Sequence, residues 1–149
     1  MKYKILNSKE NKKIISMLKD QYGYNQKFNY VLLQNQSGRI YVVNEEVFDL
    51  DLDKLRINSF GIYFGTEQGK DIRLSIEGSQ LIGALCNKNV IEISKEQSKN
   101  WLFGLDLEIE GDFIGFVIIK SGTSFLGCGK FYNNKIQNFV PKTRRIGSL

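Results

Sequence analysis

The stretch FLGCGKFYNNKIQNFVPK, residues 125–142, decides the fold of the C-terminal half. Two strands, about Phe125 to Lys130 and Lys135 to Val140, are predicted on either side of Asn133-Asn134, a pair that tolerates the positive φ of a tight turn. A third strand, about Phe116 to Lys120, precedes them across a Ser-Gly-Thr turn. Three short strands in close succession are typical of a small β-barrel or sandwich.

One helix is clearly marked upstream of these strands. Ser94-Lys95-Glu96-Gln97 is a capping box, and the helix is predicted to end near Phe103-Gly104. Trp101 lies in this helix. We expect it in the core, because a tryptophan at a helix position is more often buried than used as a platform for nucleic-acid bases.

The beginning of the chain has a different pattern. A short strand (Tyr3 to Leu6) and an amphipathic helix that Gly23 ends are followed by a predicted hairpin, Tyr30 to Val43, whose turn is Asn35-Gln36-Ser37-Gly38. After an acidic, irregular stretch (44 to 56), a further strand is predicted from Ile57 to Phe64.

Glu67 to Lys70 has turn composition and is the best candidate for a domain boundary. We therefore predict an α+β protein, with a small N-terminal α/β unit at residues 1–67 and a basic β domain at residues 68–149 that pack together.

The distribution of charge favours an anionic partner for the C-terminal end. The net charge is +5, and from Phe113 onward there are basic residues but no Asp or Glu; the basic ones are Lys120, Lys130, Lys135, Lys142, Arg144 and Arg145. The arginines have the fork-shaped guanidinium that suits phosphate. Two interpretations remain open from charge alone, namely RNA binding and a merely solubilising surface.

Few residues of the chain are suited to catalysis or metal binding. There is no histidine, and the two cysteines, Cys86 and Cys128, are too far apart and too few for a zinc site or a disulfide framework. Cys128 has apolar and glycine neighbours, so a packed thiol is favoured over a nucleophile. The alternation from Asp106 to Asp112 is more typical of a solvated strand face than of a cation site. We expect no metal, no cofactor and no enzymatic activity.

The chain shows no membrane segment or signal sequence. Its longest apolar run, Phe113 to Ile119, is far too short to cross a bilayer, and no hydrophobic leader opens the sequence. We therefore expect a cytoplasmic protein.

Several motifs of the C-terminal half occur in the order found in one known family. The segment Phe125 to Lys130, the Lys135 to Lys142 segment and the pair Arg144-Arg145 resemble the PUA-like C-terminal domain of RNA cytosine-C5 methyltransferases of the NOL/NOP/Sun type. Arg73 to Gly83, with a glycine-bearing turn expected near Gly78, and the Ser94 helix are similar to the early strand, turn and helix of PUA domains. The resemblance covers roughly residues 68 to 146 and implies a β-pseudobarrel that binds structured RNA.

The resemblance also implies a set of RNA contacts on the first helical turn and the late strands. They are Arg73, Gly78, Ser79, Gln80, Lys130, Asn138, Lys142, Arg144 and Arg145. The methyltransferase part of the family is not matched, since no glycine motif for S-adenosylmethionine and no Pro-Cys pair is present. The arrangement of a small unit ahead of the domain is similar to archaeal-type proteins with a pre-PUA and a PUA unit.

The sequence thus leads to two hypotheses. The first is a non-catalytic protein that recognises structured rRNA or tRNA in ribosome biogenesis or RNA modification. The alternative is an adaptor whose N-terminal unit docks an RNA-modifying enzyme or an assembly factor.

Overall fold

The computed structural model describes residues 3–44 and 61–147. In chain order its elements are β1 (Lys4–Ile5), α1 (Ser8–Tyr22), β2 (Tyr30–Gln34), β3 (Arg39–Asn44), β4 (Ile62–Gln68), β5 (Asp71–Leu74), α3 (Ile76–Ile82), the 3-10 turn η3 (Gly83–Leu85), β6 (Val90–Glu92), α4 (Lys95–Leu102), β7 (Leu107–Glu108), β8 (Gly115–Ser121), β9 (Ser124–Tyr132), β10 (Lys135–Asn138) and η4 (Lys142–Arg144). Over these two ranges, no helix combines the length and the apolar character needed to traverse a bilayer.

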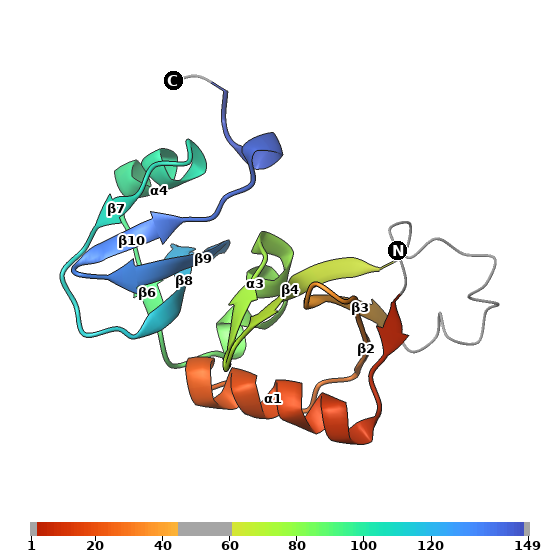
Figure 1. Cartoon of the computed structure of the whole chain (residues 1–149). Helices are drawn as coiled ribbons and strands as arrows, with labels where there is room; N and C mark the ends of the chain where they lie inside the picture. The colour runs from red at the N-terminus through yellow and green to blue at the C-terminus, as the bar shows by residue number, and fades with distance from the viewer. Residues whose placement is uncertain (1–2, 45–60, 148–149) are drawn as a thin grey trace.

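The first sheet is antiparallel and follows chain order, β1-β2-β3-β4-β5. Helix α1 packs along it (Figure 1) and contributes Ile14 and Leu18 to the core. Asn7 begins this helix, because its side chain accepts a hydrogen bond from the Glu10 amide while the Glu10 carboxylate accepts one from the Asn7 amide. Gly23 ends it in the left-handed conformation, at φ 68°.

The second sheet has the order β6-β8-β9-β10-β7, with β6 parallel to β8 and the other pairs antiparallel. Helix α4 supplies the fully buried Trp101 to a core on one face of this sheet. The indole N–H of Trp101 donates to the Leu126 carbonyl, so this large side chain is buried without leaving its donor unpaired.

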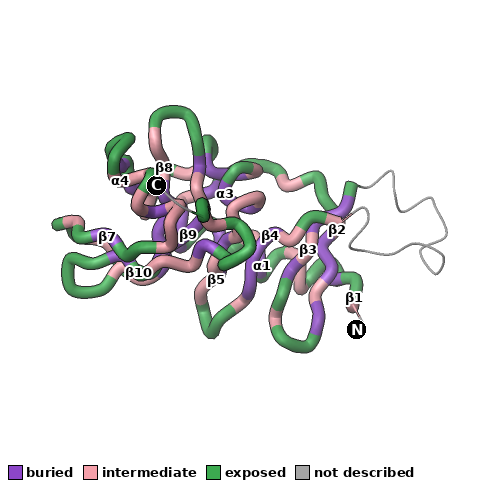
Figure 2. Tube along the Cα trace, turned by 90° about the horizontal axis from the view of Figure 1, so that it is seen from above, coloured by how far each residue is buried: buried purple, intermediate pink, exposed green. Residues whose placement is uncertain are grey.

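Strand β8 is apolar along most of its length because both of its faces are covered. Phe116 and Ile118 pack with α1 and the first sheet, whereas Val117 and Ile119 pack with Trp101. Alternate residues of a strand point to opposite faces, so β8 serves two cores. The view in Figure 2 has β1 to β4 on one side, β7 to β10 on the other, and buried residues between them.

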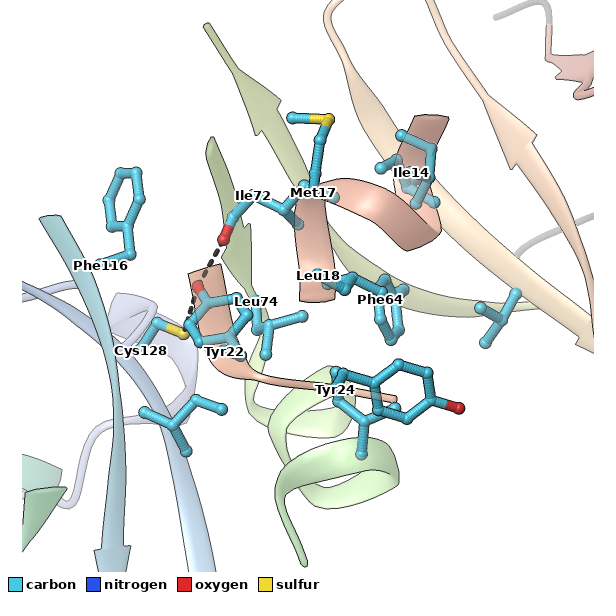
Figure 3. Close-up of a cluster of buried hydrophobic side chains, with 14 of the residues drawn as sticks. Ile14, Met17, Leu18, Tyr22, Tyr24, Phe64, Ile72, Leu74, Phe116 and Cys128 are labelled. Carbon is cyan, nitrogen blue, oxygen red and sulfur yellow. Dashed lines mark hydrogen bonds between the residues drawn. The ribbon is translucent and has the colours of Figure 1, made fainter. Parts of the chain in front are cut away.

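Tyr22, at the end of α1, connects the two sheets (Figure 3). Its hydroxyl donates to the carbonyl of Ile72 in β5 at 2.5 Å and lies 3.5 Å from the Cys128 sulfur in β9. The neighbouring Gln21 accepts a hydrogen bond from the Ile72 amide. Because β5 is an edge strand, these two side chains satisfy backbone groups that no further strand pairs. The expectation that the two halves pack together is confirmed.

Most predicted elements are present, and three expectations change. The strand predicted at 57 to 64 is β4, at Ile62–Gln68, and the stretch from 45 to 60 lies outside the described residues. The boundary predicted between residues 67 and 68 falls inside the β4–β5 hairpin, so the first sheet continues to Leu74. The residues around Gly78 form the helix α3 and not a turn. Turn-forming residues are shared by linkers and hairpins, which is why composition favoured a boundary at this hairpin.

Candidate nucleic-acid interface

Arginines from both halves of the chain line one cleft, which we call the arginine cleft. Arg39 of β3, Arg73 of β5 and Arg144 of η4 surround a cavity of about 270 Å³. Its walls are the β5–α3 junction on one side and Phe139 to Pro141, which follow β10, on the other. Figure 1 shows η4 next to α3, although the two are far apart in the sequence.

Each arginine of the cleft is held by a specific neighbour. The guanidinium carbon of Arg39 lies 4.2 Å from the centre of the Tyr63 ring, and that of Arg73 lies 4.6 Å from the centre of Phe139. Arg144 forms an ion pair with Glu77 at the first turn of α3. Three guanidinium groups and one carboxylate leave the cleft with net positive charge, which favours an anion such as a phosphate group.

A chain of aromatic contacts connects Lys130, another predicted contact, to Phe139 in the cleft. Phe139 contacts Phe116 edge-to-face at 6.0 Å, and the Lys130 ammonium lies 5.9 Å from the Phe116 ring centre. Lys142 is exposed in η4, beside Arg144. Of these predicted contacts, Arg73 and Arg144 line the cleft, whereas Lys130 and Lys142 lie outside its lining. Gln80 is exposed on α3.

Two predicted contacts, Gly78 and Ser79, are inside the protein. A Cβ atom at Gly78 would come within 2.0 Å of the Phe64 carbonyl oxygen, so the glycine permits α3 to pack against β4. Ser79 is 0% exposed; its hydroxyl donates to the Ile76 carbonyl and accepts from the Gly127 amide. We therefore correct the predicted interface by leaving these two residues out, since neither has a group free to reach RNA.

Asn138 and Arg145 also have structural partners. The Asn138 amide group donates to the carbonyls of Trp101 and Leu105, and its oxygen accepts from the Val140 amide. The Arg145 guanidinium donates to the Val140 carbonyl and packs on Gly104. Asn138 anchors α4 to the end of β10, so we remove it from the predicted base-reading positions. The Nε–H of Arg145 fixes the chain after η4, and its role as a phosphate contact stays a prediction.

Neither cysteine is chemically activated. Cys128 is buried, and burial raises the pKa of its thiol from 9.0 to about 11. Burial likewise raises the pKa of the half-buried Cys86 to about 12, with a smaller contribution from Cys128. Both thiols are protonated at neutral pH, where only a thiolate would be nucleophilic. Within residues 3–44 and 61–147, no group of three Cys, Asp or Glu side chains is placed to hold a metal ion.

The structure adds three residues to the cleft that the sequence did not indicate: Arg39, Tyr63 and Phe139. Arg39 and Tyr63 belong to the first sheet, ahead of the residues that carry the family resemblance. The alternation of Arg39 and Tyr41 on one strand was a usable signal, because polar and aromatic side chains two residues apart share a strand face.

The two packed sheets together form a PUA fold. A solved PUA domain from Aeropyrum pernix K1 superimposes with a TM-score of 0.53, at 15% sequence identity, over 87% of this chain and 71% of that one. The predicted PUA-like pseudobarrel within an α+β chain is confirmed.

Sequence comparison narrows the class further. Residues 88–146 match the family described as the methyltransferase RsmF PUA domain. Ribosomal RNA small subunit methyltransferase F of Vibrio vulnificus (strain YJ016) is 25% identical over 91 residues, 61% of this chain and 19% of that protein. Its counterpart in Shewanella sp. (strain MR-4) is 28% identical over 99 residues, 61% of this chain and 21% of that protein. The C-terminal part of this chain is therefore a PUA domain resembling those of Sun-type methyltransferases, and the chain spans about a fifth of the length of these relatives.

Proposed function

We propose that this protein binds structured RNA without catalysing a reaction, and that the RNA is ribosomal. The observation that supports this most directly is the convergence of Arg39, Arg73 and Arg144 on one cleft with Lys142 beside it. Phosphate contacts supply most of the affinity of such surfaces, and guanidinium groups can bind a phosphate through two parallel hydrogen bonds.

The identity of the RNA rests on the relatives. The matched curated proteins are named as ribosomal RNA small subunit methyltransferases, so rRNA is the first ligand to test and tRNA the second. A role in rRNA modification or ribosome biogenesis, in the cytoplasm, follows from that ligand. The raised pKa of both thiols supports a non-catalytic role, because neither cysteine is a nucleophile at neutral pH.

Double-stranded RNA is recognised mainly through its shape, its phosphates and its 2′-hydroxyls, because its major groove is too narrow for side chains to read. The cleft fits this mode, since it offers several cations at fixed positions. Arg39 and Arg73 are positioned over aromatic rings, so less conformational freedom is lost when they bind a phosphate than for a free side chain.

The test is fluorescence anisotropy with a blunt RNA hairpin across a salt titration. We expect the Arg73→Gln/Lys142→Gln/Arg144→Gln variant to bind more weakly at low salt, with a log–log salt slope shallower by roughly 2 to 3, about one per phosphate contact removed. Arg145 stays unchanged in this variant because it holds the Val140 carbonyl. The control is Lys95→Gln/Lys99→Gln, which removes two exposed cations from α4, one fewer than the cleft variant.

Equal slopes for the cleft variant and the α4 control would overturn the proposed site. If the wild-type protein binds no hairpin RNA at low salt, the adaptor hypothesis, with an enzyme or assembly factor docked on the N-terminal unit, becomes the better account.

A further inference from the structure

The solvent face of the first sheet has a row of aromatic side chains that the core does not use. The Tyr3 and Tyr41 rings are in edge-to-face contact with centres 5.1 Å apart, and the Tyr41 and Tyr63 rings are 5.6 Å apart. Arg39 covers Tyr63. We call these four residues, Tyr3, Arg39, Tyr41 and Tyr63, the tyrosine–arginine strip.

The strip is on the opposite side of the sheet from the packed core. The alternate residues of the same strands, Ile40, Val42 and Phe64, are buried against α1, while the three tyrosines are only half-buried and belong to neither hydrophobic cluster. Aromatic rings that remain accessible are a common feature of binding surfaces.

The strip is continuous with the arginine cleft. Arg39 pairs across the strands with Thr66, and Thr66 pairs with Arg73, so the two arginines lie in one row on the same face. The Tyr63 hydroxyl is hydrogen-bonded to the Thr66 hydroxyl, which fixes the ring beside this row. Arg39 and Tyr63 both line the cleft as well. A ligand that leaves the cleft over β4 therefore meets Tyr63 first and Tyr41 next.

We propose that the tyrosine–arginine strip binds a single-stranded RNA segment adjoining the structured element in the cleft, with bases stacked on Tyr41 and Tyr63 and the backbone neutralised by Arg39. This inference rests on the proposed function of the cleft and extends it to the first sheet.

The chemistry of the strip selects single-stranded RNA. Bases inside a duplex are stacked on one another and have no free face, whereas unpaired bases stack on Tyr, Phe or the plane of an Arg side chain. Every base has a π face, so the strip would tolerate many sequences, and sequence or shape selection would remain with the cleft. No acidic side chain belongs to the strip to repel the backbone.

The experiment compares a blunt RNA hairpin with the same hairpin carrying a single-stranded tail of several nucleotides, attached at either the 5′ or the 3′ end. We expect the wild-type protein to bind one of the tailed RNAs at least about five-fold more tightly than the blunt RNA, since one stacked base contributes roughly that factor. The preferred end of the tail reports the direction in which RNA crosses β4.

Substitutions separate stacking from folding. Tyr41→Leu removes a ring of the strip that does not line the cleft but keeps an apolar side chain suited to a strand, and it should reduce the advantage of the tailed RNA while leaving blunt-hairpin affinity unchanged. Tyr41→Phe keeps the ring and should retain the advantage. Tyr132→Leu, which alters a tyrosine that is 71% exposed at the β9–β10 turn, is the distant control. Thermal melts of all variants verify folding.

Each outcome distinguishes the strip from the cleft. If the wild-type protein binds tailed and blunt hairpins equally, or if the Leu and Phe variants behave alike, the strip inference is overturned while the cleft function stands. If the protein binds neither RNA, both are overturned.

Discussion

Replacing Tyr22 with phenylalanine deletes a single buried oxygen at the junction of the two halves. That oxygen donates to the Ile72 carbonyl and accepts from the Gln21 side-chain amide at 3.1 Å. The N–H and C=O groups of one antiparallel strand residue point to the same side, and those of Ile72 face α1, away from β4. In the variant the carbonyl loses its donor and Gln21 loses an acceptor. At about 1–3 kcal/mol for each unsatisfied buried group, partly relieved by relaxation, we expect the free energy of unfolding to fall by about 2–4 kcal/mol.

Urea denaturation measures this loss with two independent probes. Circular dichroism at 222 nm follows the helices of the whole chain, whereas the fluorescence of Trp101, the single tryptophan, follows the core behind the second sheet. If the halves unfold together, both probes give one transition with the same midpoint, and the variant shifts that midpoint without altering its steepness.

A loss below about 0.5 kcal/mol would refute the reasoning, because it would mean that the Ile72 carbonyl finds another donor at no cost. Separate midpoints for the two probes in the wild-type protein would refute the assumption that the junction makes the halves cooperative, and would indicate two units that unfold independently.

Three further outcomes follow from the structure. Gly78→Ala forces a Cβ toward the Phe64 carbonyl and should cost about 1–3 kcal/mol in thermal or urea unfolding, whereas Gln80→Ala on the same helix should cost little. Asn138→Ala removes three hydrogen bonds and should lower stability by about 2–3 kcal/mol, with hairpin affinity of the folded protein unchanged; a selective loss of RNA binding would restore Asn138 to the interface. The pKa of the Cys128 thiol is 9.0 in the unfolded chain and about 11 in the folded protein. The stability that follows from this difference is complete below pH 9 and is lost as pH rises from 9 to 11. Cys128→Ala should therefore flatten the fall of the urea midpoint over that range.

Local sequence patterns predicted the helices and turns that depend only on residues adjacent in the sequence. The capping box at Ser94 is present with both of its reciprocal hydrogen bonds to Gln97, and α4 ends at Leu102, close to the predicted position. The Asn133-Asn134 turn has positive φ at both residues, as a tight hairpin between β9 and β10 requires. Motif resemblance identified the PUA domain for the same reason, since its motifs are short and contiguous.

Features that depend on distant segments were beyond the reach of sequence patterns. Helix α3 contains a glycine in its interior, which lowers helix propensity, and only the approach of β4 explains that glycine. The convergence of Arg39 on Arg73 depends on the register of three strands, which shifts between β3 and β4 at Ile40 and Tyr41. The partners of Asn138 come from α4 and the segment after it, so a residue predicted to read RNA belongs instead to the scaffold.

The double-sided burial of β8 limits how this domain can be moved between proteins. The family match begins at residue 88, but a chain cut there would expose Phe116, Ile118, Phe125 and Cys128, which pack on α1, β5 and α3. An apolar patch of that kind promotes aggregation. The alignment with the Vibrio relative, at 91 residues, is longer than the chain from residue 88 to its end, so the similarity reaches upstream of the family match. We therefore expect gene fusions that transfer the barrel between proteins to transfer the preceding sheet with it, as one structural unit.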